Sequence, residues 1–467
     1  MIKITRIEKD SLGEKELPDE VYYGIQTARA IENFPVSAIM ERPEFIYSYV
    51  FLKKAAALAN MELRVLDKEK GKAIVKAADE ALTGKFDDQF KVDVYQAGAG
   101  TSFNMNVNEI LANRALEILG RPKGDYDFLS PNDHVNMAQS TNDTFPTASH
   151  IAVIIAADKL LQVLEDLAKA FKEKSDEFKA VPKSGRTHLM DATPLTLGYE
   201  FLAYGVAIER AAERIKQRRD DLLELPIGGT AVGTGANAHP KYRETAIAEL
   251  SELCSLPFTH AKDSFEALQS RSQLGAFSSS LKELALELIR IANDLRLLGS
   301  GPTTGLAEIE LPAIQPGSSI MPGKVNPVMA ECLNMVAFQV VGNDATVSLA
   351  VQAGQMDLNV MTPVMTYNIL QSIAILTNYL PVFRKRCVEG IKANEERCRS
   401  YLDLNPSLAT LLSSKIGYLK AAEIAKESWK KKIPVAELAI AKGIITQEEA
   451  NKLFDPKNTT RSKYHEF

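Results

Sequence analysis

The chain has 467 residues, of which 45% are hydrophobic and 25% charged, an ordinary composition for a globular protein. Its formal net charge is -5 and no run of lysines and arginines forms a stripe, which argues against a nucleic-acid partner. The apolar run at residues 151–157 is far shorter than the roughly 18 residues of a membrane span. The charged N-terminus lacks the apolar stretch of a secretory signal, and the four cysteines form no Cys-x-x-Cys pair. We therefore expect a soluble cytoplasmic protein without a disulfide framework or a zinc site.

Three regions follow one another along the chain. Residues 1–140 have short helical patterns and many turns, which predicts a mostly helical N-terminal domain. Residues 141–395 carry the apolar spacing of long amphipathic helices, expected at 150–179, 195–225, 263–298, 328–353 and 361–394. Residues 396–467 return to short pieces, such as KAAEIAKESWKK and VAELAIAKG, and predict a small helical C-terminal domain.

The central helices are much longer than the ~11–12 residues of an average helix, which indicates an elongated bundle and an all-α fold. Residues 338–354 (FQVVGNDATVSLAVQAG) are apolar on almost every side of the expected helix. A helix of this kind needs partners on several faces. We therefore expect other subunits to complete the bundle.

Polar loops interrupt the helical pattern at residues 98–106, 139–147, 185–194 and 317–327, each ahead of an apolar run. Each loop is thus expected to lead into a helix, whose first turn offers free N–H groups and a partial positive charge to an anion. In the last loop, Asn326 and Pro327 are expected as N-cap and first helical residue, with Lys324 adding charge. Ser, Thr and Asn before helices usually serve only as caps. Spacing alone therefore predicts a helical protein with a candidate small-anion site.

Several motifs add a resemblance to a known family. GAGTSFNMNVNEILANRA, HVNMAQSTNDTFPT, GRTHLMDATPLTLG and GSSIMPGKVNP occur in the order of the aspartase/fumarase superfamily and resemble its segments. The resemblance covers essentially the whole chain. It implies a three-domain all-α fold and a homotetramer whose central helices merge into one bundle. It further implies active sites shared by three subunits, and an enzyme that eliminates a small group from a succinyl skeleton to release fumarate.

Differences within these segments distinguish the branches of the superfamily. The start RIEKDSLGEKELPDEVYYGIQT, the STND form of the second loop and the NPV ending resemble the ammonia-lyase branch. We therefore expect a carbon–nitrogen lyase that converts L-aspartate to fumarate and ammonia. HLMDATPLTLG and SFEALQ resemble the fumarate hydratase branch, which adds water to fumarate to give L-malate, and this stays the alternative. Met190, Tyr199 and Thr303 depart from common family residues.

The resemblance also implies roles for individual residues. In the family, the β-carboxylate of the substrate becomes an enediolate, and the residues that match its binding site are Thr101, Ser140, Thr141 and Ser319. The α-carboxylate site is matched by Thr187, Lys324 and Asn326. Asn142 and His188 match residues near the amino group. Ser318 matches the general base, and Glu331 matches a residue that pairs with His188. The presence of these residues argues against a non-catalytic scaffold.

The expected chemistry needs no metal and no organic cofactor, because hydrogen-bond donors carry the developing charge. A divalent ion as an activator is left open. The expected ligands are small dicarboxylates, L-aspartate and fumarate. The glycines that flank Ser318 are expected to let its loop close over them.

Overall fold

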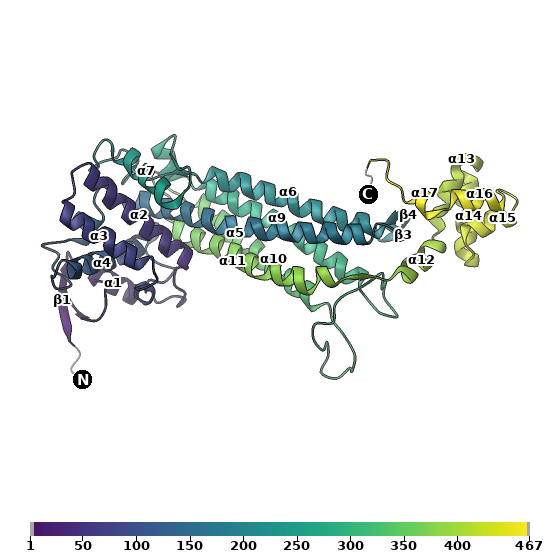
Figure 1. Cartoon of the computed structure of the whole chain (residues 1–467), viewed down its shortest axis with the longest axis horizontal. Coiled ribbons are helices and arrows are strands. Elements are labelled where there is room, and N and C mark those ends of the chain that lie inside the picture. The colour runs from purple at the N-terminus through teal and green to yellow at the C-terminus, as the bar shows by residue number, and fades with distance from the viewer. Residues whose placement is uncertain (1–3, 465–467) are drawn as a thin grey trace. The chain divides into compact units, whose positions relative to one another are not determined.

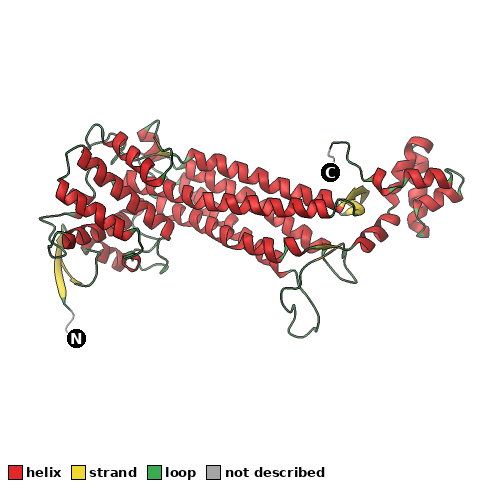
Figure 2. Cartoon of the chain, in the orientation of Figure 1, coloured by secondary structure: helices red, strands yellow, loops and turns green. Residues whose placement is uncertain are grey.

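The computed structural model describes residues 4–464, and helices dominate it (Figure 2). Helices account for 62% of the chain, which confirms the predicted all-α class. Within the described residues, strands occur only as short two-stranded pairs. These strands are β1 (Thr5–Asp10) with β2 (Gly13–Pro18), β3 (Pro182–Thr187) with β4 (Met190–Thr196), β5 (Glu224–Leu225) with β6 (Thr259–His260), and β7 (Ile309–Glu310) with β8 (Lys392–Ala393).

The described chain divides into two compact units, each assembled from several segments. Unit 1 contains residues 1–161, 213–283 and 339–376, and unit 2 contains residues 162–212, 284–338 and 377–467. The division into domains 1–140, 141–395 and 396–467 rests on helix length along the sequence and stays a prediction. None of the described helices is long and apolar enough to cross a membrane.

Unit 1 begins with short helices, shown in purple and blue in Figure 1. They are α1 (Ile25–Asn33), α2 (Pro43–Glu62), α3 (Lys68–Ala81), α4 (Thr101–Ile118) and, later in the chain, α7 (Tyr242–Cys254). Helix α2 packs against α3 and α7, and α3 packs against α4. Helix α2 is buried on most of its sides, Lys53 and Asn60 included, and this packing stabilises the short helices as one cluster.

An aromatic cluster joins the start of α4 to the start of the long helix α5 (Thr141–Glu177). Phe45 stacks within 5.3 Å of Phe103 and 4.7 Å of Phe145, measured between ring centroids. Gly100, just before α4, has φ +86°, and a Cβ there would overlap the ring of Phe145. Only glycine fits this left-handed position at such close approach. The contact places the first turns of α4 and α5 side by side.

All five expected long helices are present and most of their ends lie within a few residues of the expected ranges, although the last one ends at Arg386 and not at 394. The structure has α5 (Thr141–Glu177), α6 (Leu197–Asp221), α9 (Ser272–Leu298), α10 (Val328–Gln352) and α11 (Thr362–Arg386). The expected helix 263–298 is divided, because a short α8 (Ser264–Gln269) ends before α9 begins. Helix α5 starts nine residues earlier than expected and carries Pro146 inside its second turn.

Polar contacts tie neighbouring long helices together within each unit. In unit 1, the hydroxyl groups of Ser149 and Thr366 lie 2.7 Å apart, which joins α5 to α11. In unit 2, Tyr204 of α6 donates a 3.2 Å hydrogen bond to the Asp294 carboxylate of α9. Such buried or half-buried contacts fix the register between helices that apolar packing alone leaves free to slide.

The third polar loop leads into a helix as expected, but it forms a β-hairpin that the sequence did not predict. Residues 182–196 form the antiparallel hairpin β3–β4, with a register shift between Ser184 and Gly185, and α6 follows it. The first two loops are largely helical themselves, because α4 begins at Thr101 and α5 at Thr141. Backbone pairing and tertiary packing here prevail over the local turn signals.

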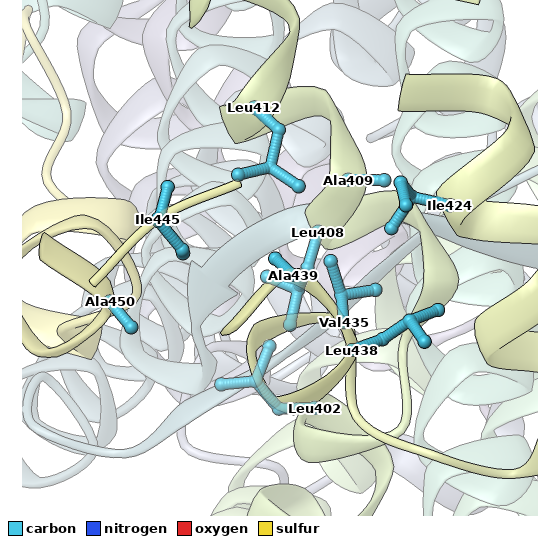
Figure 3. Packing of buried hydrophobic residues seen from close by; sticks show 10 residues of the cluster. All are labelled: Leu402, Leu408, Ala409, Leu412, Ile424, Val435, Leu438, Ala439, Ile445 and Ala450. Carbon is cyan, nitrogen blue, oxygen red and sulfur yellow. The ribbon is translucent and has the colours of Figure 1, made fainter. Parts of the chain in front are cut away.

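The C-terminal end of unit 2 has its own small apolar core (Figure 3). Its side chains come from α12 (Glu395–Asp403), the 3₁₀ segment Pro406–Leu412, α13 (Ser413–Ile416), α14 (Tyr418–Lys431), α15 (Val435–Ala441), α16 (Gln447–Leu453) and the residues next to them, and the short α17 (Pro456–Thr459) follows. Leu412, Leu438 and Ile445 are among its buried side chains. The two short helical pieces expected from the sequence correspond to α14 and α15.

Candidate active site

A cavity of about 460 Å³ lies in unit 1, where the first turns of α4 and α5 meet. Thr101, Ser140, Thr141 and Asn142, which the sequence assigns to substrate binding, all line it. Three hydroxyl groups and one amide are thus gathered in one hollow. Donors of this kind suit a carboxylate.

The start of α5 orients these side chains. The Ser140 carbonyl accepts the backbone N–H of Thr144 at 3.0 Å, and the Ser140 hydroxyl oxygen accepts the N–H of Asn142 at 3.2 Å. The Asn142 amide donates a 2.7 Å hydrogen bond to the carbonyl of Ala231. Ser140 therefore caps α5 while it lines the cavity.

A buried layer of amide side chains behind the cavity was not found from the sequence. Asn104 donates to the Thr141 hydroxyl at 3.0 Å and to the Asn136 Oδ1 oxygen at 3.2 Å. The Lys53 ammonium, fully buried, donates to Asn136 at 3.0 Å and to Gln139 at 2.8 Å. Burial lowers the pKa of Lys53 well below its ordinary value. The sequence feature that could have predicted this layer is the presence of amide side chains, such as Asn104, within a helical pattern.

Several polar atoms around this layer lack a hydrogen-bond partner within residues 4–464. They are the Oδ1 oxygens of Asn60, Asn104 and Asn108 and the hydroxyl of Thr230. Asn104 and Thr230 are only 2% and 4% exposed and both line the cavity. Unsatisfied buried groups are costly, so the Oδ1 oxygen of Asn104 and the hydroxyl of Thr230 are candidate contacts for a ligand in the cavity.

Thr187 and His188 lie at the tip of the β3–β4 hairpin in unit 2, and both are exposed. The turn places His188 at φ +57° and Leu189 at φ +60°. Two residues at positive φ are typical of the tightest hairpin turns, which normally use Asn and Gly. A leucine held there is strained, and such strain concentrates at functional sites.

A buried ionic group anchors the base of this hairpin. The Arg186 guanidinium donates to both oxygens of the Glu308 carboxylate, at 2.8 and 2.9 Å. The Lys183 ammonium lies 3.0 Å from Glu308 and 2.7 Å from Glu200. Glu308 is fully buried and Lys183 is 1% exposed. Burial raises the pKa of Glu200. Two cations and two carboxylates thus hold strand β3 from beneath.

The remaining predicted residues lie in unit 2, where Glu331 is in the first turn of α10 and the others are on the loop before it. This loop is closed at its base. The Gly317 N–H donates to the Lys324 carbonyl at 2.8 Å, and the Asn326 side-chain amide donates to the Gly317 carbonyl at 2.6 Å. The Ser318 hydroxyl oxygen accepts the N–H groups of Ile320 at 3.2 Å and Met321 at 3.0 Å. Helix α10 begins at Val328, one residue after Pro327. The Asn326 amide therefore closes the loop.

Exposure differs among the residues of this region. Ser319 and Lys324 are exposed, while Ser318 and Glu331 are half-buried. Within residues 4–464, Glu331 makes no direct hydrogen bond with His188. Neither the hairpin tip nor the loop contributes to the described lining of the 460 Å³ cavity. The structure thus brings the predicted residues together in three separate groups.

No group of three or more His, Cys, Asp or Glu side chains in the described part of the chain is arranged to hold a metal ion. All four cysteines, which fall within that part, are free thiols. The polar wall of the cavity consists of hydroxyl and amide groups, whose chemistry suits hydrogen bonding to an organic anion.

Residues 13–342 match the family described as Lyase, and residues 408–461 match the one described as Fumarase C C-terminus. The chain belongs to this lyase family. The predicted membership of the aspartase/fumarase superfamily and the predicted lyase class are therefore confirmed.

Relatives within the family cover nearly the full chain. An aspartate ammonia-lyase from Bacillus sp is 51% identical over 455 residues, 97% of each chain. A class II fumarate hydratase from Thermosynechococcus vestitus is 46% identical over 449 residues, 96% of each chain. The crystal structure of a fumarate lyase:delta crystallin from Brucella melitensis bound to cobalt matches with a TM-score of 0.95 at 46% identity, over 98% of this chain and 100% of that one.

Proposed function

We propose that the protein is a carbon–nitrogen lyase that converts L-aspartate reversibly to fumarate and ammonia. The observation that carries this proposal is the 51% identity to the aspartate ammonia-lyase from Bacillus sp over 97% of both chains. The cavity lined by Ser140, Thr141 and Asn142 supports it, because hydroxyl and amide donors fit a dicarboxylate.

The β-carboxylate is held by Thr101, Ser140, Thr141 and Ser319. Removal of a proton from the neighbouring carbon moves the electron pair into this carboxylate, which becomes a dianionic enediolate. Preorganised donors stabilise such developing charge most effectively. The enediolate then re-forms the carboxylate, the carbon–carbon double bond forms, the carbon–nitrogen bond breaks, and ammonia leaves with the electron pair.

Ser318 is the general base. A serine hydroxyl is a weak base, so its oxyanion needs stabilisation. The N–H groups of Ile320 and Met321 point at the Ser318 oxygen, at 3.2 and 3.0 Å, and supply part of it. Lys324, on the same loop, adds a positive charge. The oxyanion takes the proton from the β-carbon and becomes a neutral hydroxyl.

The other predicted residues bind the opposite end of the substrate. Thr187, Lys324 and Asn326 hold the α-carboxylate, and Asn142 and His188 lie near the amino group. Glu331 pairs with a His188 contributed by another subunit. In the single chain, the Asn142 amide is engaged with the Ala231 carbonyl, so substrate competes with or joins that contact.

We further propose that a homotetramer assembles these groups, with three subunits contributing to each active site. Helix α10 supports this, because Met335, Phe338 and Leu349 are exposed on one of its faces, at 62%, 57% and 67%. Gly342 and Ala345 lie on the same exposed face. A continuous apolar stripe of this kind is covered in most stable proteins. The free thiols suit the cytoplasm, where we place the enzyme.

Fumarate hydratase is the second candidate, because the relative from Thermosynechococcus vestitus is 46% identical over 96% of both chains. The test is a substrate panel of L-aspartate, L-malate, argininosuccinate and adenylosuccinate, followed by the ultraviolet absorbance of fumarate and by an ammonia assay. Fumarate and ammonia in equal amounts from L-aspartate are expected. Fumarate from L-malate alone would replace the proposal by the hydratase.

A further inference from the structure

Next to the cavity in unit 1, a buried carboxylate to which the mechanism above gives no role is bonded to the backbone of two lining residues, Ser140 and Thr230. Asp143 lies in the first turn of α5 and is fully buried. Its Oδ1 oxygen accepts the backbone N–H of Ser140 at 3.0 Å. Its Oδ2 oxygen accepts the N–H groups of Gly228 at 3.0 Å and Thr230 at 2.9 Å. One carboxylate thus joins two loops that lie about 85 residues apart in sequence.

The second loop adopts a backbone that needs such an anchor. Gly228 has φ +91°, and a Cβ there would lie 2.6 Å from the side chain of Arg243. Thr230 has φ +53°, which is a rare conformation for a β-branched residue. A strained residue of this kind persists only when surrounding contacts hold it. The hydrogen bond from Thr230 to Asp143 is one such contact, and the one from Asn142 to Ala231 is another.

Both anchored loops form the wall that binds the carboxylate. Ser140, Thr141 and Asn142 line the cavity on one side, and Thr230 and Ala231 line it on the other. The Thr230 hydroxyl is buried there and lacks a partner within the described residues. The separation of the two sides depends on Asp143, because it bonds the backbone of both.

We infer that Asp143 is a positioning residue, whose carboxylate clamps the Ser140 and Gly228–Thr230 loops at the spacing that the enediolate requires. This inference rests on the proposed function. Three backbone N–H groups, at 2.9 to 3.0 Å, hold both oxygens of the Asp143 side chain, and this buried network makes the clamp rigid. Rigid donors stabilise the transition state without reorganisation. Asp143 does not touch the substrate and acts through the loops.

The test replaces Asp143 by its isosteric amide. In Asp143→Asn only one oxygen remains, so the NH₂ group must face the N–H of Ser140 or those of Gly228 and Thr230. One side of the clamp opens in either orientation. A misplacement of about 1 Å can cost about 100-fold in rate. We expect kcat to fall about 100-fold and KM to change less than about fivefold, because the donors matter most in the transition state.

Asp93 offers a matched control. It is 5% exposed and also accepts three backbone N–H groups, from Ser37 at 2.7 Å, Ala38 at 2.8 Å and Tyr95 at 2.9 Å. None of these three partners lines the 460 Å³ cavity, whereas Ser140 and Thr230, which bond Asp143, both do. Asp93→Asn should lower the unfolding midpoint comparably while kcat per folded protein stays within about threefold of wild type.

The result that overturns the inference is equal kcat in Asp143→Asn and Asp93→Asn, each normalised to folded tetramer. If Asp143→Asn does not fold, the kcat of Asp143→Glu is compared with that of Asp93→Glu. The longer carboxylate keeps the charge but shifts the clamp, and the same loss of kcat is expected. Wild type is assayed first, and the variants are compared on whichever dicarboxylate it converts. If the wild-type protein does not convert L-aspartate, the proposed function is wrong. The role of Asp143 can still be tested with the dicarboxylate that the wild-type protein does convert.

Discussion

Glu308→Gln probes the buried ionic group beneath the hairpin that carries His188. The change removes one negative charge from a set of two cations and two carboxylates. Glu308 is fully buried, and its oxygens lie 2.8 and 2.9 Å from the Arg186 guanidinium and 3.0 Å from the Lys183 ammonium. The glutamine keeps one acceptor oxygen and turns an NH₂ group toward a cation. Lys183, 1% exposed, cannot recover its hydration.

The size of the effect follows from this geometry. Removing one partner of a buried pair typically costs about 3–5 kcal/mol, because the other charge stays uncompensated. Glu200, 2.7 Å from the Lys183 ammonium, still offsets part of the charge. We therefore expect the lower end, a loss of about 3 kcal/mol in the free energy of unfolding.

The assay is urea-induced unfolding followed by circular dichroism, at one protein concentration for all variants because subunit assembly affects stability. Glu310→Gln is the matched control, since Glu310 lies in the same strand β7 and is exposed. It should change the free energy of unfolding by less than about 0.5 kcal/mol. Equal unfolding midpoints for Glu308→Gln and Glu310→Gln would refute the reasoning.

The remaining predictions concern the proposed base, the exposed stripe of α10 and a buried histidine. Ser318→Ala should lower kcat for L-aspartate about 10³-fold, in the range of a positioned base, while the Kd of succinate stays within about threefold. A kcat within about tenfold of wild type, or about 1.4 kcal/mol of barrier, would exclude Ser318 as the base. Phe338→Glu should give particles smaller than a tetramer in light scattering and no activity; unchanged mass would contradict the assembly. Burial lowers the pKa of His150 to about 4. Between about pH 6.5 and 4, His150 is therefore protonated in the unfolded chain and neutral in the folded chain. Stability should fall by up to about 3 kcal/mol between pH 6.5 and 4, and His150→Gln should flatten this slope in urea titrations; an unchanged slope speaks against it.

The sequence alone determined the features that depend on local spacing. Apolar periodicity located the five long helices to within a few residues at most ends, because each turn repeats the same burial requirement. The motifs around Ser140, His188 and Ser318 resembled segments of the family, and the match of residues 13–342 to the lyase family confirms it. The apolar residues on almost every side of the expected helix at 338–354 predicted the exposed stripe through Phe338.

Tertiary structure decided the features that join distant segments. The residues around His188 form a hairpin, because backbone pairing and the ionic group at Glu308 outweigh the local turn signals. Thr101 reaches the Ser140 cavity because Gly100 allows the chain to approach Phe145. Asp143 looked like an ordinary first-turn acid, and its partners Gly228 and Thr230 are 85 and 87 residues away. No local pattern encodes such contacts, since they exist only after packing has buried the carboxylate and the N–H groups together.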